Sequence, residues 1–152
     1  MLTYFIIIVL TLGVIGVYIT NSMRQYNLNQ KKIQILSQAN VVAGYISQYQ
    51  DLSNKSINYL LEQQQIDSKS RVLMLDKDAR VMYDSNNGIM QGKLMPTAAI
   101  LDAIDGNNNV EQLTDADDEL IICAAVPIIE NKAVTGVIYY QASAADTVDF
   151  MN

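Results

Sequence analysis

The sequence RVLMLDKDARVMYDS, residues 71–85, indicates most directly how this chain folds. It contains two candidate strands, Val72–Leu75 and the mainly apolar Arg80–Tyr83, on either side of the polar segment Asp76–Ala79. Short apolar runs suit β-strands, and a polar segment with two aspartates suits a tight turn. The stretch therefore predicts a β-hairpin.

The residues after this hairpin predict one short helix and three more strands. Pro96 precedes residues 97–104 and Gly106 follows them, which is typical of a helix with proline near its start and glycine past its end. Pro127 indicates an edge position or a bulge in its strand, because proline cannot donate a hydrogen bond to a neighbouring strand. Short turns between strands favour an α+β fold, with an antiparallel sheet of about five strands and helices on one face. The three further strands are predicted at Val110–Leu113, Leu120–Ile129 and Val134–Ala142.

Residues 21–50, upstream of the hairpin, predict a long helix with a narrow apolar stripe. This spacing suits a helix that packs on one face of a sheet, and it equally suits a helix that pairs with its copy in a homodimer. A second helix is predicted to begin at Ser53 or Asn54, which are good N-cap residues, and to end near Gln65. The stripe, named the apolar seam, consists of Ile35, Ala39, Val42, Ile46 and Tyr49.

The segment Leu2–Ile19 has no charged side chain and predicts a membrane anchor. A helix of about 18 residues rises roughly 27 Å, which is close to the thickness of the hydrocarbon layer. A cleaved signal peptide is the main alternative, but Thr20–Met23 contains no good cleavage site. We expect a single-pass transmembrane anchor over residues 1–20 and one domain over residues 21–152.

The composition disfavours several classes of function. The chain has 152 residues, a net charge of -6 and no histidine. The lack of histidine removes Ser-His-Asp chemistry, a phosphoaccepting histidine and the commonest zinc ligand. The acidic balance disfavours nucleic-acid binding, and residues 94–152 carry 10 acidic side chains and 1 basic one. The single cysteine, Cys123, lies in an apolar run and is expected in the core. We expect neither a cofactor nor an enzymatic activity.

Four segments, taken in order, resemble the Cache/PAS-like extracytoplasmic sensor domains of bacterial two-component histidine kinases. They are RVLMLDKDARVMYDS (71–85), Gly92-Lys93, AVPII (125–129) and TGVIYYQAS (135–143). The resemblance covers residues 21–152, and it implies a membrane-anchored domain outside the cytoplasm that senses a small ligand or ion. It also implies that a second membrane helix, a linker and a kinase core follow in a longer protein.

The sequence departs from this family in two places, and its charge pattern conflicts with the implied orientation. The turn that often carries glycine has Asp78-Ala79 here, and the histidine that some members use to bind carboxylates is missing. No basic residue precedes the anchor, whereas Arg24, Lys31 and Lys32 follow it. By the distribution of positive charge alone, the domain would lie in the cytoplasm. We therefore expect a basic segment upstream of this sequence.

The resemblance places a ligand pocket between the sheet and the loops after the second strand. We expect Arg80, Tyr83, Asp84 and Ser85 to bind the ligand there. Residue alternation along this strand predicts that Val81 and Tyr83 share one face, with Arg80 and Asp84 on the other. The alternative is that Tyr83 belongs to the core and that Asp84-Ser85 caps a turn.

The densest acidic cluster offers a candidate metal site. It consists of Asp115, Asp117, Asp118 and Glu119, and carboxylate oxygens are the ligands that Ca²⁺ and Mg²⁺ prefer. The cluster lacks the glycine and the distal glutamate of an EF-hand loop, so a solvated turn is the alternative.

The sequence as a whole predicts the sensing domain of a membrane-bound sensor histidine kinase, which couples signal binding to the anchor helix. A homodimer through the first long helix is expected. The same domain would equally serve a chemotaxis receptor or a cyclic-dinucleotide synthase. A membrane-tethered structural or adaptor protein is a further alternative.

Overall fold

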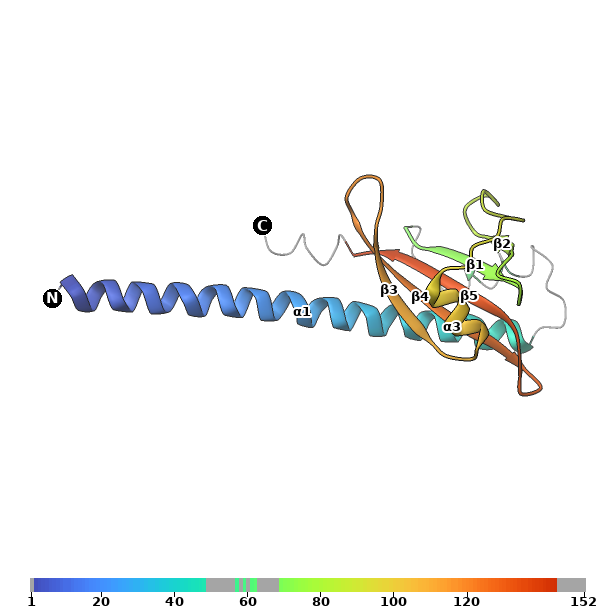
Figure 1. The fold of residues 1–152 in the computed structure, drawn as a ribbon, viewed down its shortest axis with the longest axis horizontal. Coiled ribbons are helices and arrows are strands. Elements are labelled where there is room, and N and C mark those ends of the chain that lie inside the picture. Colours follow the sequence, from blue (N-terminus) through green and yellow to red (C-terminus); the bar gives the residue numbers. More distant parts are fainter. Residues whose placement is uncertain (1, 49–56, 58, 60, 63–68, 145–152) are drawn as a thin grey trace.

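A computed structural model describes residues 2–48, 57, 59, 61, 62 and 69–144 of the chain. One long helix, α1 (Leu2–Gln48), runs from the N-terminus across one face of a β-sheet (Figure 1). Its 47 residues correspond to about 70 Å of helix, so its N-terminal half projects well beyond the sheet. The predicted anchor and the predicted long helix therefore form one continuous element.

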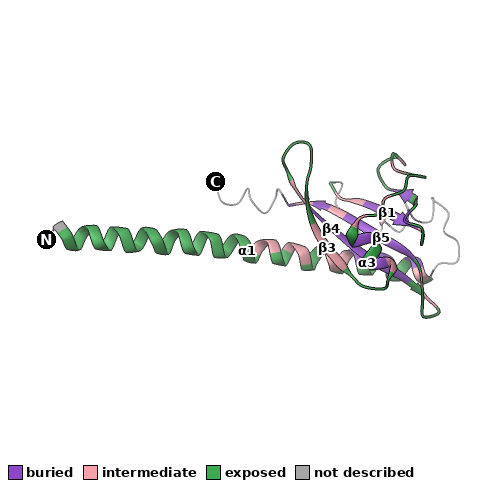
Figure 2. Cartoon of the chain, in the orientation of Figure 1, coloured by how far each residue is buried: buried purple, intermediate pink, exposed green. Residues whose placement is uncertain are grey.

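The N-terminal part of α1 has no covering layer within the described residues. Its large apolar side chains from Tyr4 to Ile19 are 51–76% exposed (Figure 2). Within the described residues, α1 is the one helix that is long and apolar enough to cross a membrane. Apolar side chains in such number are stable when a bilayer covers them.

The sheet has five antiparallel strands in the order β2-β1-β5-β4-β3, which confirms the predicted α+β class. The last strand lies at the centre, because β5 pairs with both β1 and β4. This arrangement brings the start of β1 beside the end of β5, although the two are about 70 residues apart in sequence. The strands are β1 (Arg71–Leu75), β2 (Val81–Asp84), β3 (Asn109–Thr114), β4 (Leu120–Glu130) and β5 (Ala133–Ser143).

The expectation of helices on one face is wrong, because α1 and the short helix α3 (Ala98–Ile104) cover opposite faces. The central strands are apolar on both sides, so each face requires a cover. Along β4, Ala124 packs in the cluster under α1, and Cys123 packs in the cluster under α3. An unbroken apolar run such as that of β4 is typical of a strand buried on both faces.

The apolar seam packs against the sheet of its own chain. Ile35, Ala39, Val42 and Ile46 are each no more than 4% exposed and belong to the cluster under α1. The fifth seam residue, Tyr49, lies outside the described residues, as does most of the helix predicted from residue 53 or 54 to about 65. The seam is therefore part of the intramolecular core.

Local signals placed the turns and α3 correctly. The Thr97 hydroxyl caps α3 by accepting a hydrogen bond from the N–H of Ile100 at 3.3 Å, and Gly106 follows with a φ of 95°. Pro127 pairs with β5 but lies beyond the end of β3, whose first residue is opposite Ala125. Pro127 thus occupies a local edge, where its missing N–H costs no ladder hydrogen bond.

Candidate functional site

Asp84, at the end of β2, is a buried carboxylate with a complete set of hydrogen bonds. Its side chain is fully buried and forms an ion pair with Arg71, the first residue of β1. Arg71 donates from Nε to Oδ1 at 2.9 Å and from Nη2 to Oδ2 at 2.7 Å. The backbone N–H groups of Asn86 and Met90 donate to the same carboxylate, each at 2.9 Å. Asp84 therefore fixes the loop after β2 and the position of Arg71.

The protonation of this pair follows from its surroundings. Burial on its own would raise the pKa of Asp84, but the hydrogen bonds from Arg71, Met90 and Asn86 outweigh it and lower the pKa below the ordinary value. The hydrogen bond to Asp84 raises the pKa of Arg71. Both groups are thus charged at neutral pH, and the guanidinium is held in one orientation.

A β-bulge in β2 overturns the predicted alternation of Val81 and Tyr83. Met74 pairs with Tyr83 and Leu75 pairs with Val81, so Met82 is an extra residue in β2. As a result, Tyr83 packs under α1 and Val81 packs under α3. Met82 itself is 48% exposed. The sequence pattern contained no signal for this irregularity.

None of the four residues predicted to bind a ligand lines either of the two cavities described below. Arg80 is exposed and donates to the carbonyl of Gly92 at 2.9 Å. The Ser85 hydroxyl accepts a hydrogen bond from the N–H of Val72 at 2.9 Å. Tyr83 belongs to the core, and Asp84 is fully occupied by its own partners.

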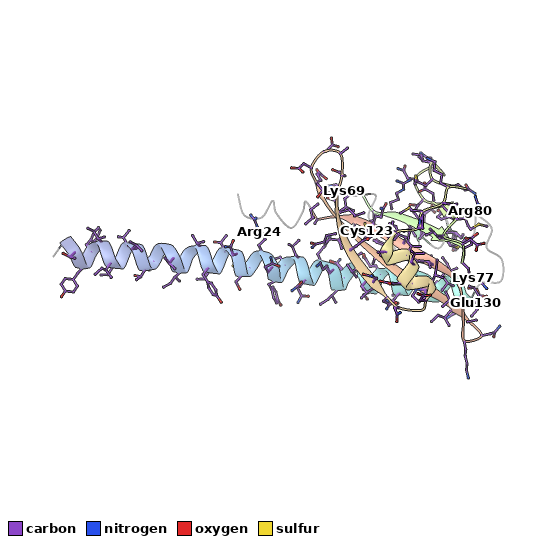
Figure 3. All side chains as sticks on the ribbon, viewed as in Figure 1. Arg24, Lys69, Lys77, Arg80, Cys123 and Glu130 are labelled. Atoms are coloured by element: carbon purple, nitrogen blue, oxygen red, sulfur yellow. The ribbon has the colours of Figure 1, made fainter. Side chains whose placement is uncertain are left out.

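The larger cavity lies at the end of the sheet that faces the N-terminal part of α1. It has a volume of about 400 Å³. One side of the sheet is covered by α1 and the other by α3. Side chains alternate between these two sides along each strand, and this alternation puts Arg71, Ile121 and Gln141 on the side covered by α3. Figure 3 shows Lys69 at this end of the domain, away from Lys77. The lining residues are Lys69, Arg71, Asn86, Asp115, Glu119, Ile121, Gln141, Ala142 and Ser143.

A second cavity of about 80 Å³ shares part of its lining with the first. The two cavities share Lys69, Ala142 and Ser143. The remaining lining of the smaller one includes residues of α1 between Lys31 and Gln38. Three residues therefore line both the larger cavity and a cavity that α1 borders.

The acidic cluster is a turn, built in the same way as the turn between β1 and β2. The Asp115 carboxylate accepts hydrogen bonds from the N–H groups of Asp117 at 2.9 Å and Glu119 at 3.0 Å. In the other turn, the Asp76 carboxylate accepts hydrogen bonds from residues two and four positions later, each at 2.9 Å. Asp118 and its counterpart Ala79 both have a positive φ, of 62° and 58°. Each aspartate carboxylate thus accepts hydrogen bonds from backbone N–H groups of its own turn.

This geometry does not assemble the predicted metal site. In the part of the chain that the structure describes, no group of three or more acidic, cysteine or histidine side chains gathers as metal ligands. Asp115 and Glu119 line the larger cavity, whereas Asp117 and Asp118 do not.

Cys123 is buried, as predicted, and lies beside a buried tyrosine. The Tyr139 hydroxyl donates to a Glu111 carboxylate oxygen at 2.6 Å, and the Gln141 amide donates to the Cys123 sulfur at 3.8 Å. Burial raises the pKa of Cys123 and of Tyr139. A buried thiol with a raised pKa is a poor nucleophile.

One part of the cavity could have been predicted from the sequence. Arg71 and Asp84 flank the predicted hairpin at its open end, so strand pairing alone would have brought them together. For Lys69, Gln141 and Ser143 there was no such signal, because their proximity depends on the insertion of β5 beside β1.

Comparison with known proteins gives matches in structure only. No family model and no curated protein matches this sequence. The sensor domain of the histidine kinase DctB of V. cholerae is 15% identical, with a TM-score of 0.57 over 83% of this chain and 59% of DctB's. The sensor domain of E. coli DcuS is 14% identical, with a TM-score of 0.53 over 84% of this chain and 96% of DcuS's.

A chemoreceptor domain has the same architecture. The ligand-binding domain of the P. aeruginosa PAO1 amino acid chemoreceptor PctC, in complex with GABA, is 18% identical, with a TM-score of 0.64 over 93% of this chain and 64% of PctC's. This chain has the Cache-like fold of bacterial sensor domains. It spans about three fifths of the DctB and PctC domains. The Cache-like fold accounts for the central β5 and for the long helix on one face of the sheet.

Proposed function

We propose that this chain is the extracytoplasmic sensing part of a membrane-bound receptor, and that the receptor is a two-component histidine kinase. One observation carries the proposal. The helix α1 continues without a break from an exposed apolar segment, 0% buried, into the core of a Cache-like sensor fold. A helix of this kind anchors the domain in the bilayer and moves with the sheet on which it packs.

The proposed signal is a small molecule bound in the larger cavity. That cavity shares Lys69, Ala142 and Ser143 with the smaller cavity at α1, so a bound molecule would contact side chains that also line α1. Transmission requires that the molecule bind two arrangements of α1 with different affinity. A displacement of α1 along its axis would then reach the other side of the membrane.

In this proposal the chain itself is not an enzyme. Its 152 residues contain no histidine, and the thiol of Cys123 is buried with a raised pKa. The kinase activity would belong to another part of a longer protein. A chemotaxis receptor is the second candidate, favoured by the structural match to PctC, and the sequence downstream of this chain distinguishes the two.

A homodimer remains part of the proposal, but through a different face of α1. The apolar seam is buried in its own core, so it is closed to a partner. On the far side of the helix, Tyr26, Ile33 and Val41 are 64%, 62% and 43% exposed. These positions are spaced by seven and eight residues, which places them on one stripe of the helix. Two anchored copies would meet in parallel along this stripe.

Cysteine cross-linking tests the dimer. In a Cys123→Ser background, we expect Ile33→Cys to form a disulfide-linked dimer in membranes, because the side chain at position 33 is exposed. Ile46→Cys serves as the matched control, since Ile46 is 1% exposed. Equal cross-linking at the two positions would rule out this interface.

Membrane topology tests the proposed function. Alkaline phosphatase, fused after Asn152, is active only outside the cytoplasm. We expect an active fusion, and a green fluorescent protein fused at the same residue should remain dark. The opposite result would place the domain in the cytoplasm and refute an extracytoplasmic sensor.

A further inference from the structure

We propose that the smaller cavity, between α1 and the sheet, binds a dissolved inorganic oxyanion such as phosphate or sulfate. The proposed sensing function does not depend on this second site, and the site does not depend on which signal the larger cavity binds. The inference rests on the side chains that line the cavity. They come from one stripe of α1, from the residues before β1 and from the end of β5.

The helix contributes polar side chains next to its apolar seam. Lys31, Gln34 and Gln38 line the cavity together with Ile35. Counted from Lys31, these positions follow at three, four and seven residues, so they form one stripe of α1 that faces the sheet. Ile35 is 1% exposed in the cluster under α1, and the polar residues flank it. The sequence of α1 contains no aspartate or glutamate, so no acidic residue of the helix competes for Lys31.

The opposite wall comes from the sheet. Tyr140 and Ala142 belong to the cluster under α1, which places the cavity on the α1 side of the sheet. Lys69 and Ser70 precede β1, and Ser143 is the last residue of β5. The cavity therefore lies at a junction between the helix and the two strands.

The chemistry of the lining favours negative charge. Its polar side chains are two lysines, two glutamines, two serines and one tyrosine, and all of these can donate hydrogen bonds. Among the described residues, no aspartate or glutamate lines this cavity, whereas Asp115 and Glu119 line the larger one. Two ammonium groups repel a cation, and an oxyanion accepts charge-assisted hydrogen bonds from both.

The size and position of the cavity favour a dissolved inorganic anion. Its volume of about 80 Å³ exceeds the roughly 10–15 Å³ that one water needs and is far below the roughly 300–1,000 Å³ of metabolite pockets. A lipid phosphate has the same chemistry but lies too deep when α1 stands upright in the bilayer. Lys31 lies 12 residues beyond Ile19, which corresponds to about 18 Å of helix, whereas each headgroup layer is about 5–8 Å thick.

A bound oxyanion bridges the helix and the sheet. It accepts hydrogen bonds from Lys31 on α1 and from Lys69 and Ser70 beside β1, and it reduces the repulsion between the two ammonium groups. Because the cavity exists only where α1 packs on the sheet, the anion binds the folded chain and raises its stability by mass action. The expected signature is a melting temperature that rises with the concentration of the anion.

Titrations with simple salts test the site. The full chain is purified in a maltoside detergent, which contains no phosphate, and its melting temperature is followed by circular dichroism as sodium phosphate or sodium sulfate is added. Sodium chloride and magnesium chloride at equal ionic strength control for screening and for cation binding. We expect a saturating rise of several degrees with phosphate or sulfate, and a smaller effect of both chlorides. Equal effects of all four salts would overturn the site.

Substitutions at neighbouring positions of α1 locate the bound anion. Lys31→Gln should weaken the apparent affinity for phosphate about tenfold or more, as expected for one hydrogen bond to a charged group. Lys31→Arg keeps the positive charge and should retain binding. Lys32→Gln is the matched control, because Lys32 is also half-buried on α1 but does not line the cavity. Equal affinity in Lys31→Gln and Lys32→Gln would overturn the assignment, and so would a loss in Lys31→Arg as large as that in Lys31→Gln.

Mixed micelles distinguish the dissolved anion from a lipid headgroup. Phosphatidylglycerol, added to the detergent in place of phosphate, should not change the difference in melting temperature between the unaltered chain and Lys31→Gln. Dissolved phosphate should increase that difference. The reverse result, an increase with the lipid and none with phosphate, would assign the site to a headgroup and overturn the dissolved anion.

Discussion

The ion pair of Arg71 and Asp84 should make a large contribution to folding, and Asp84→Asn measures it. The carboxylate accepts four hydrogen bonds, two from Arg71 and one each from the N–H groups of Asn86 and Met90. Asparagine keeps the shape but replaces one oxygen by an NH₂ group. Two of the four N–H donors then face the new NH₂ group, which is itself a donor. The Arg71 guanidinium also loses its counter-charge.

The expected loss of stability is about 3 kcal/mol. Removal of one partner from a buried ion pair typically costs about 3–5 kcal/mol. We expect the low end of this energy range because the Arg71 side chain is 28% exposed and retains contact with water. For a domain of about 100 residues, a loss of this size lowers the melting temperature by roughly 10 °C or more.

The assay is thermal unfolding of the full chain in detergent, followed by circular dichroism at pH 7 and at pH 3. The control is Asp78→Asn, which changes an exposed aspartate and should shift the melting temperature by very little. The pKa of Asp84 is lowered in the folded state, so its stabilisation is complete above the ordinary aspartate pKa of about 3.9 and is lost as the pH falls through the folded value. The difference in melting temperature between the unaltered chain and Asp84→Asn should therefore be largest at pH 7 and smaller at pH 3. A variant as stable as the control, or a gap that does not change with pH, would refute the role of the ion pair.

Two further substitutions test the packing of the sheet. Ile46→Ala should destabilise the domain by about 3 kcal/mol in urea unfolding, because Ile46 is 1% exposed under the sheet, whereas Ile33→Ala at a 62% exposed site should cost less than about 0.5 kcal/mol. Equal losses would contradict the assignment of the buried face of α1. Gly136→Ala should cost about 1–3 kcal/mol, because a Cβ there would lie 2.6 Å from the backbone oxygen of Leu75. Gly44→Ala, in open space on a helix, should be neutral or stabilising, and a loss there comparable to that of Gly136→Ala would argue against the close approach.

The elements of this fold were predictable because local chemistry decides them. The β3, β4 and β5 strands begin and end within one or two residues of their predicted bounds. The strands β4 and β5 are apolar runs closed by polar turns, and the more polar β3 lies between turns at Gly106 and Asp115. Thr97 begins α3 as a capping hydroxyl. The apolar seam indicated a packed face, and the structure identifies its partner as the sheet.

Strand pairing, rather than local sequence, decides two features that the sequence analysis did not predict. The bulge at Met82 depends on how β2 pairs with β1, and one extra residue reverses the side chains that follow it. The cavity depends on the insertion of β5 between β1 and β4, which brings Lys69 near Glu119 across 50 positions of sequence. Local periodicity carries no information on either point, so the predicted ligand residues were taken from a single hairpin.

The position of β5 also bears on how the proposed sensor would transmit a signal. The strand is paired on both sides, so its end at Ser143 cannot move without disturbing β1 or β4. The same end lines both cavities, and the smaller one borders α1. Coupling between two sites is typically 1–3 kcal/mol, which is the size of one hydrogen bond to a charged group. In the proposed sensor, one contact of this kind, made in one arrangement of α1 and lost in the other, would therefore be enough to couple the cavity to the helix.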